Sequence, residues 1–221
     1  MIMSIVTSEG GLTVFGYGLC AAAVILFLGT ASFWHSASSH SRKLSTKQLV
    51  FCAAAMALSF LTSYMKIFAF PYGGSVTLFS MLFICLIGYW YGPLPGLMTG
   101  LAYGILQFLQ EPYVLSFFQV CCDYVLAFAG LGLAGLFYKS KNGLIKGYLL
   151  GILIRGAFHS LGGYLYWMDY MPENFPQSLA TFYPIIYNYS YILAEGVLTV
   201  IVISLPPVSK ALTQVKRLAV S

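Results

Sequence analysis

The sequence predicts an all-α integral membrane protein, and three observations support that prediction. Hydrophobic residues make up 59% of the 221 residues and charged residues only 8%, whereas about 25% of the residues in a typical soluble domain are charged. Apolar stretches close to the roughly 20 residues that a bilayer span needs follow one another along the chain. The length leaves room for one compact membrane domain.

The first apolar stretch runs from about residue 12 to residue 34. It has neither the basic leader nor the clear cleavage site of a signal peptide, so we expect a retained helix. A serine-rich polar linker follows and ends in Arg42 and Lys43. Residues 1–43 are therefore predicted to be an extra N-terminal transmembrane helix with its linker.

Six further spans are predicted between residues 44 and 210, which we expect to form a six-helix membrane domain. The second of them is short, which favours a tilted and partly buried helix, and turn-forming residues follow it directly. Residues 211–221 are predicted to be a cytoplasmic tail. The six spans are expected at about residues 48–68, 77–91, 94–110, 116–138, 147–168 and 184–207.

The basic residues predict the orientation of these spans. Threading seven spans through a membrane places nine lysines and arginines on one side, while the other side keeps only Lys66 together with Glu9, Glu111, Asp169 and Glu173. Because cytoplasmic loops are enriched in basic residues, we expect the N-terminus outside and the C-terminus in the cytoplasm. This bias accounts for the net charge of +5, so the charge gives no argument for nucleic-acid binding. The nine basic residues are Arg42, Lys43, Lys47, Lys139, Lys141, Lys146, Lys210, Lys216 and Arg217.

The five cysteines all fall within apolar spans, and none forms a CxxC pair or lies beside a histidine at metal-ligand spacing. Buried thiols that pack as small hydrophobic groups are the favoured interpretation. We therefore predict neither a metal site nor a cofactor.

Polar residues recur at helical spacing in three of the predicted spans, and each such residue is costly in lipid unless it has a partner. Residues at i, i+3 or i+4, and i+7 or i+8 share one helix face. The three stripes are Ser116, Gln119 and Asp123; Arg155, His159 and Tyr166; and Asn188, Tyr191 and Glu195.

Two interpretations of these stripes compete. Polar residues in spans can serve only as interhelical hydrogen bonds, and a structural ion pair between Arg155 and Glu195 is the favoured role for those two. However, His159, Asn188 and several aromatic residues fall toward the outer ends of their spans, and Asp123 lies somewhat deeper. This gathering on one side of the membrane favours a ligand site that faces outward.

The loop of residues 70–77 lies on the same predicted outer side and contains Tyr72, Gly73 and Gly74. Glycine permits close backbone approach and positive φ angles. The loop is either an ordinary turn or a flexible lid over the site.

Four stretches together resemble the thiamine-specific S-component of energy-coupling-factor vitamin transporters. The resemblance extends over about residues 44–207 and leaves the first helix outside. The stretches are PYGGSVT (71–77), QVCCDYVLAFAGLGLAGLF (119–137), FHSLGGYLYW (158–167) and Tyr183 with YNYSYILAEG (187–196).

The resemblance implies a high-affinity thiamine-binding subunit rather than an enzyme. In that family the subunit lies in a bacterial cell membrane, docks onto a membrane scaffold with two ATPases, and releases the vitamin inside. By resemblance, the acidic ligand contact is Asp123, followed by Tyr124. Gln119, Arg155 and Glu195 are expected beside the site. The remaining implied contacts are His159 and Trp167 as stacking residues, with Tyr113, Tyr183 and Asn188.

Two positions remain open within this resemblance. Some relatives carry a tryptophan where this chain has Gly74, so Tyr72 or Phe70 is expected to replace it. The first of the six spans contains Ala53 and Ala57 in a small-xxx-small arrangement that permits close helix approach. The resemblance implies scaffold docking there, whereas the residues alone are equally compatible with packing inside the protein.

The chemistry of thiamine agrees with these residues, because a thiazolium cation calls for a carboxylate and aromatic faces. Two other classes remain alternatives. An intramembrane enzyme could use Asp123 and His159 as an acid–base pair, but no HExxH or GxSxG motif accompanies them. A self-sufficient secondary transporter would be expected to show internal repeats. No Walker A sequence is present, so ATP hydrolysis would come from partner chains.

Overall fold

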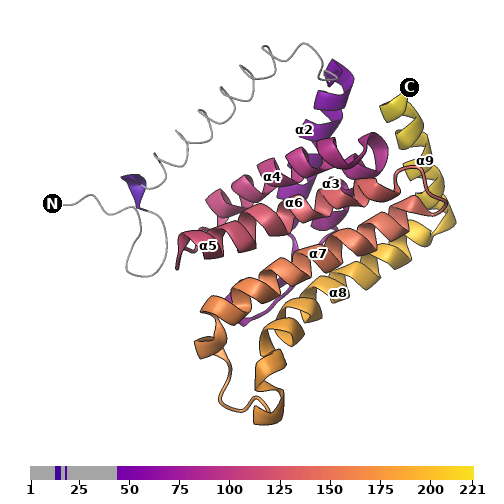
Figure 1. The fold of residues 1–221 in the computed structure, drawn as a ribbon. Coiled ribbons are helices and arrows are strands. Elements are labelled where there is room, and N and C mark those ends of the chain that lie inside the picture. Colours follow the sequence, from indigo (N-terminus) through magenta and orange to yellow (C-terminus); the bar gives the residue numbers. More distant parts are fainter. Residues whose placement is uncertain (1–12, 16–17, 19–43) are drawn as a thin grey trace.

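The computed structural model describes residues 13–15, 18 and 44–221 (Figure 1). The extra N-terminal helix predicted at residues 12–34 lies almost entirely outside the described residues. The all-α membrane fold predicted from composition is confirmed. Four helical segments among the described residues are long and apolar enough to cross a membrane: Thr46–Ser63, Phe117–Phe137, Gly143–Tyr166 and Gln177–Ser204.

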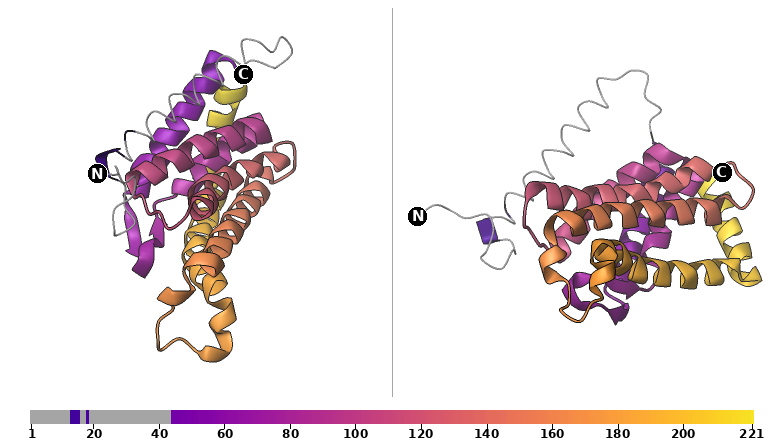
Figure 2. Two further views of the ribbon diagram at one scale, coloured as in Figure 1. Left: turned by 60° about the vertical axis from the view of Figure 1, so that its left-hand side comes forward. Right: turned by 60° about the horizontal axis from the view of Figure 1, so that its bottom comes forward.

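Between residues 44 and 221, six helical segments form a bundle and a further helix, α9, crosses one end of it (Figures 1 and 2). α5, η2, α6 and η3 are continuous and are called the 117–137 helix below. The elements are α2 (Thr46–Ser63), β1 (Lys66–Ala69), η1 (Pro71–Gly73), β2 (Ser75–Thr77), α3 (Ser80–Tyr91), α4 (Pro93–Gln110), α5 (Phe117–Val120), η2 (Cys121–Leu126), α6 (Ala127–Leu131), η3 (Gly132–Phe137), α7 (Gly143–Tyr166), η4 (Met168–Tyr170), η5 (Gln177–Phe182), α8 (Tyr183–Ser204) and α9 (Pro206–Val220).

The first span begins and ends in ways that its residues explain. Ser45 and Gln48 form a capping box at the start of α2, because the Ser45 side chain accepts from the Gln48 amide and the Gln48 side chain accepts from the Ser45 amide. α2 ends at Ser63 rather than at the predicted residue 68. The apolar residues that follow form β1, which pairs with β2 as an antiparallel hairpin.

The short helix α3 lies in the middle of the bundle. Nine of its twelve residues are buried, so the segment is short as predicted and more fully buried than the partly buried helix that was expected. It packs against α2, α4, α7 and the 117–137 helix. Because it is covered on nearly all sides by protein, its length is not set by the thickness of the bilayer.

The 117–137 helix changes its geometry along its length. Residues 121–126 form a π-helical turn, and residues 132–137 are wound as a 3-10 helix. π-helical turns inside α-helices are frequent at functional sites, and this one contains Asp123. The cap at the start of this helix is Ser116, whose side chain accepts from the Gln119 amide (3.0 Å).

α9 was not predicted as a separate helix. It crosses the end of the bundle from α8 toward the start of α2 (Figures 1 and 2). The Tyr91 hydroxyl donates to the Ala219 carbonyl (3.0 Å), and Lys47 Nζ donates to Ser221 Oγ (3.0 Å). Residues 211–221, predicted as a tail, therefore include the packed second half of α9. We call this end the basic end, and the end of the bundle near Lys66 the cavity end.

Candidate ligand-binding cavity

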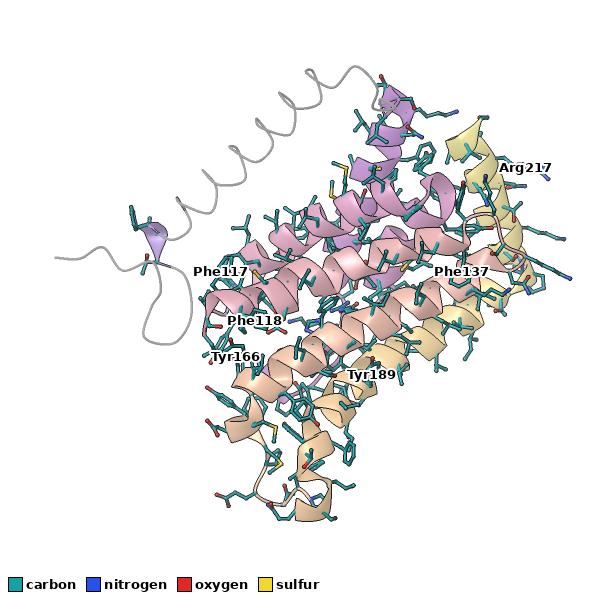
Figure 3. The ribbon with its side chains drawn as sticks, viewed as in Figure 1. Phe117, Phe118, Phe137, Tyr166, Tyr189 and Arg217 are labelled. Atoms are coloured by element: carbon teal, nitrogen blue, oxygen red, sulfur yellow. The ribbon has the colours of Figure 1, made fainter. Side chains whose placement is uncertain are left out.

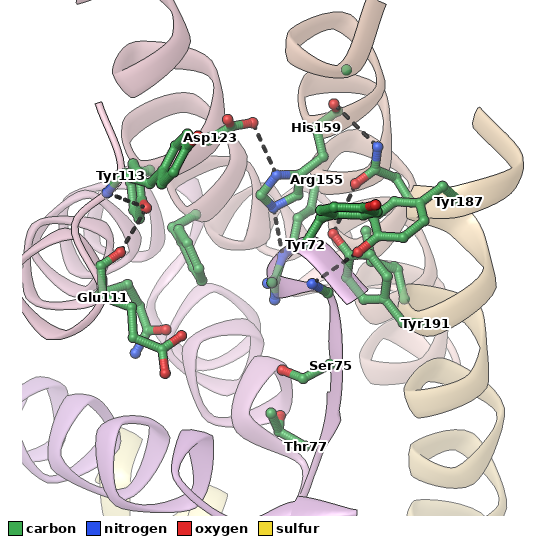
Figure 4. A pocket seen from close by; sticks show the side chains of 18 of the residues that line it. Tyr72, Ser75, Thr77, Glu111, Tyr113, Asp123, Arg155, His159, Tyr187 and Tyr191 are labelled. Carbon is green, nitrogen blue, oxygen red and sulfur yellow. Dashed lines mark hydrogen bonds and ion pairs between the residues drawn. The ribbon is translucent and has the colours of Figure 1, made fainter. Parts of the chain in front are cut away.

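A cavity of about 470 Å³ lies at the cavity end, between the hairpin, the loop after α4, the 117–137 helix, α7 and α8 (Figure 4). Its volume lies in the range of small-molecule sites. All thirteen residues predicted to bind the ligand or to lie beside it line this one cavity. They are Tyr72, Gly73, Gly74, Tyr113, Gln119, Asp123, Tyr124, Arg155, His159, Trp167, Tyr183, Asn188 and Glu195.

Asp123 faces α7 from the π-helical turn. Its Oδ2 accepts from Gln119 Nε2 (2.8 Å), and its Oδ1 lies 3.2 Å from His159 Nδ1. A Cβ on Gly162 would lie only 2.8 Å from Asp123 Oδ1. The missing side chain at Gly162 therefore lets the carboxylate reach α7, where it is largely but not fully buried, with a side-chain exposure of 14%.

His159 joins Asp123 to Arg155 in a hydrogen-bonded row (Figure 4). Arg155 Nε donates to His159 Nε2 (3.3 Å), so a neutral imidazole carries its proton on Nδ1 and donates it to Asp123. The Arg155 guanidinium also lies over the Phe128 ring, 4.4 Å from its centroid. The edge of the imidazole is thus fixed from both sides.

The predicted ion pair between Arg155 and Glu195 does not form, and this prediction was wrong. Glu195 is 2% exposed, and its carboxylate accepts from the Thr77 amide (2.8 Å), the Thr77 hydroxyl (2.6 Å) and the Met81 amide (3.3 Å). A carboxylate is favoured at a helix N-terminus, where free amides and the helix dipole meet. Glu195 therefore caps α3 and holds the end of the hairpin, while Arg155 turns to His159.

The tip of the hairpin is held by the same face of α8, one and two turns closer to the cavity opening. The Tyr187 hydroxyl accepts from the Gly74 amide (3.1 Å) and donates to the Pro71 carbonyl. A Cβ on Gly74 would lie 2.7 Å from the Tyr191 ring, so only glycine fits here without displacing the side chains of Tyr191 and Tyr187. Tyr72, at φ 64°, lines the cavity and is 54% exposed, whereas Phe70 packs outside it on Tyr187.

Aromatic side chains border the other side of the opening. The Trp167 ring lies 4.8 Å from the Tyr113 ring and 5.1 Å from the Tyr170 ring, centroid to centroid. Tyr170 also contacts Tyr72 of the hairpin tip, at 5.5 Å. These four rings come from three different loops and together border the opening of the cavity.

Tyr124 supports the loop that carries Tyr113. Its hydroxyl donates to the Glu111 carbonyl (2.8 Å) and accepts from the Tyr113 amide (3.2 Å). The carboxylate of Glu111 in turn pairs with Lys66 of β1 at 2.7 Å. The loop and the hairpin are therefore joined across the cavity by an ion pair.

Asn188 is buried and already fully engaged as a donor. Its Nδ2 donates to the carbonyls of Pro184 (2.8 Å) and His159 (3.3 Å), and its Oδ1 accepts from the Tyr191 hydroxyl (2.9 Å). Only the remaining lone pair of Oδ1 is available to a ligand. Tyr183, one turn earlier, is 8% exposed and packs edge-on against Phe175.

Several cavity residues escaped prediction. Gln107 and Gln110 of α4 line the cavity and hydrogen-bond to each other (3.0 Å). Their spacing of three residues in an apolar span was a usable signal. Thr77 gave no such signal, because its role depends on the hairpin, which the apolar composition of residues 66–69 did not reveal.

Ala53 and Ala57 lie on an exposed face of α2, so packing inside the described part of the protein does not explain them. Cys52, Ala55 and Ser59 form the buried face of the same helix. The small residues therefore point away from the bundle.

The fold and the cavity together define the class of protein. It is a multi-pass membrane protein with a small-molecule cavity that is lined by polar and aromatic residues and opens at one end of the bundle. Residues 49–215 match the sequence profile of the family described as "Thiamine transporter protein (Thia_YuaJ)". The chain belongs to this thiamine transporter family, and the resemblance drawn from its motifs is confirmed.

Known relatives agree with this membership. The thiamine transporter ThiT of Bacillus subtilis (strain 168) is 30% identical over 175 residues, which covers 71% of this chain and 85% of that protein. A solved structure of ThiT from Listeria monocytogenes shares 22% identity and superposes with a TM-score of 0.58, covering 72% of this chain and 94% of that chain. The second likeness supports the fold alone.

Proposed function

We propose that this chain is the thiamine-binding S-component of an energy-coupling-factor transporter, and that the cavity is its thiamine site. The observation that carries the proposal is the Asp123 carboxylate, held by Gln119 and His159 on the wall of a cavity whose opening is bordered by aromatic rings. The family membership and the relative from Bacillus subtilis support thiamine as the ligand.

The charges of the cavity suit a cation. The carboxylates of Asp123 and Glu195 outnumber the single guanidinium of Arg155, and Lys66 is neutralised by Glu111 at the rim. Charges in a site shielded from water interact far more strongly than in solution. Thiamine carries a permanent positive charge on its thiazolium ring, so its charge complements that of the lining.

The aromatic residues suit the two flat rings of thiamine. Trp167 and Tyr113 offer ring faces at the cavity opening, where a cation over such a face gains about 0.5–2 kcal/mol. His159 lies deeper, with its ring edge fixed by Asp123 and Arg155. In the proposed complex the aminopyrimidine lies between His159 and Trp167, and its amino group donates to Asp123.

The hairpin is proposed as the lid. Its tip crosses the cavity, and three residues make polar contacts that hold it to the rest of the protein: Tyr187 at the tip, Glu195 at the end of β2 and Glu111 on Lys66. Ring contacts of Tyr72 and Phe70 add to these. Thiamine enters when the tip leaves Tyr187 and Tyr170. In this proposal the cavity end faces outside the cell, which is the orientation that the distribution of basic residues predicts.

Release into the cytoplasm requires partner subunits in this proposal: a membrane scaffold and two ATPases. The exposed small residues Ala53 and Ala57 on α2 provide the surface that allows the scaffold to approach closely. Replacing both by tryptophan should leave thiamine binding unchanged and abolish ATP-dependent uptake. The matched control replaces Leu149 and Leu153, exposed on α7, by tryptophan and should keep uptake.

The binding experiment is direct. Purified protein in detergent should bind thiamine saturably at one site by isothermal titration calorimetry, with riboflavin and biotin as controls. Absence of thiamine binding, or equal binding of riboflavin, would remove the thiamine assignment. The same protein alone in liposomes tests the rival class, because uptake without any partner would show a self-sufficient transporter instead.

A further inference from the structure

The basic end carries a surface that thiamine binding does not use. α9 turns its apolar residues Leu212, Val215 and Ala219 toward the bundle. Lys210 and Arg217 lie on its exposed side, and Figure 3 shows Arg217 on the outward side of α9. α9 therefore lies across the end of the bundle with its cationic side uncovered.

The charged side chains at this end are all of one sign. None of the acidic side chains in residues 44–221 lies here, since Glu111, Asp169 and Glu173 are at the cavity end and Asp123 and Glu195 line the cavity. The cationic side chains at the basic end are Lys47, Lys139, Lys141, Lys146, Lys210, Lys216 and Arg217.

α9 and the start of α7 both lie close to the Tyr89 ring. Lys216 Nζ lies 3.7 Å from the centroid of the Tyr89 ring. Gly143 at the start of α7 is so close to the same ring that a Cβ there would lie 3.1 Å from Tyr89. Lys216 of α9 therefore meets, at Tyr89, the start of α7 that follows the loop carrying Lys139 and Lys141.

Apolar side chains border the cations of α9 on its uncovered side. Leu218 is 63% exposed and Val220 is 51% exposed, on either side of the buried Ala219. Leu205, at the turn into α9, is 46% exposed. A helix that faced only water would gain nothing from these side chains. Cations next to exposed leucine and valine match the boundary between lipid headgroups and acyl chains.

We propose that the basic end is a binding surface for anionic phospholipid headgroups. Lys210 and Arg217 would bind the phosphate oxygens, and Leu218 and Val220 would lie among the first acyl carbons. The bias of basic residues toward the cytoplasm explains why cations occur on this side. It does not explain a packed helix that presents Lys210 and Arg217 on one face beside exposed leucine and valine. This inference stands independently of the thiamine site.

The test uses the full chain in detergent micelles, with either phosphatidylglycerol or phosphatidylcholine added at the same concentration. Thermal unfolding should shift upward with phosphatidylglycerol only, and 0.5 M salt (about a 4 Å Debye length) should remove most of the shift. Because each cation near an anionic surface contributes about fivefold in affinity, Lys210→Gln with Arg217→Gln should raise the phosphatidylglycerol concentration for half the shift by roughly 25-fold.

Two controls locate the effect. The charge-preserving pair Lys210→Arg with Arg217→Lys should keep the selectivity, and Lys66→Gln at the cavity end should keep it as well. Equal shifts with both lipids, full selectivity in the double glutamine variant, or selectivity lost only in Lys66→Gln would each overturn the proposal. Loss of uptake by the double glutamine variant with no lipid selectivity in either protein would assign the surface to a protein partner and overturn it too.

Discussion

The two long faces of the 117–137 helix meet their neighbours in opposite ways. Toward α4 the contact is backbone to backbone, through three glycines spaced four residues apart: Gly96, Gly100 and Gly104. A Cβ on Gly100 would lie 2.4 Å from the Phe128 carbonyl, and one on Gly104 would lie 2.0 Å from the Tyr124 carbonyl. We call this contact the closed seam.

Toward the hairpin and α8, the same helix faces the cavity instead. Across the cavity the elements are connected by individual polar contacts, such as Asp123 of this helix to His159 of α7, and Glu111 of the loop after α4 to Lys66 of the hairpin. We call this the open seam. The two faces therefore have different roles. Close packing along one face fixes the position of the helix that carries Asp123 and Tyr124. Its other face can then border the cavity without loss of the fold.

The largest effect is expected from breaking the closed seam. Gly100→Leu places a side chain against the Phe128 backbone, which cannot rotate away as a side chain could. Overpacking usually costs about 1–3 kcal/mol, and we expect at least the upper part of that range. The variant should therefore lose most of its monodisperse protein after mild heating, measured by size-exclusion chromatography with and without heating.

The matched control adds the same bulk where nothing opposes it. Ala194→Leu lies on an exposed position of α8 and should unfold at nearly the wild-type temperature. If Gly100→Leu is as stable as this control, the glycines are not what holds the seam.

The second prediction breaks the open seam. Asp123→Asn removes the charge that faces the ligand, and a charge-assisted contact contributes about 1.5–3 kcal/mol. Thiamine affinity measured by calorimetry should fall by roughly ten- to a hundredfold, while the unfolding temperature changes little because the closed seam is intact. Asp169→Asn, an exposed acidic residue at the same end, should bind as the wild type does. Unchanged affinity in a folded Asp123→Asn protein would remove this residue from the site.

The sequence predicted these two seams unequally. The polar stripes through Asp123, His159 and Asn188 follow from helical periodicity, and all three residues line one cavity. The spacing Gly96-xxx-Gly100-xxx-Gly104 was an equally readable small-xxx-small signal. It predicts close helix contact but not the partner helix, because a glycine face carries no information about what covers it.

Features that depend on backbone groups were not predictable from side-chain patterns. Glu195 was expected to pair with Arg155, because those are the two charged residues deep in neighbouring spans. It instead binds amides of Thr77 and Met81, whose positions depend on the hairpin. The hairpin itself was hidden by the apolar run at residues 66–69, and α9 was hidden because Pro206 and Pro207 suggested an end rather than a turn.

A smaller effect is expected at the anchor of the hairpin. Glu195→Gln keeps the shape but replaces one acceptor oxygen by a donor, so part of the contact to Thr77 and Met81 is lost. A net hydrogen bond contributes about 0.5–1.5 kcal/mol, and the looser lid should release thiamine roughly two- to tenfold faster. The measurement is dissociation of bound thiamine into excess pyrithiamine by stopped flow.

Glu173→Gln provides the charge control for that experiment, since Glu173 is exposed at the cavity end and should not change the rate. A dissociation rate equal to that of the wild type in Glu195→Gln would limit Glu195 to stabilising the fold. A normal unfolding temperature together with faster release would assign it to the lid.

The smallest change in affinity, with the clearest spectroscopic signal, is expected at Trp167. The described residues contain one other tryptophan, Trp90, which is buried near the basic end and does not line the cavity; Trp34 lies outside the described residues. Thiamine should therefore quench tryptophan fluorescence saturably through Trp167. In Trp167→Phe the quenching should vanish while affinity falls less than about tenfold, because phenylalanine keeps an aromatic face worth most of the 0.5–1.5 kcal/mol of a ring contact.

Trp90→Phe, as the control, should retain the full ligand-dependent change. Pyrithiamine should compete, since it keeps the aminopyrimidine and a cationic ring, and riboflavin should not, because it has neither. Quenching that persists in Trp167→Phe would place the ligand away from the open seam and outside the cavity.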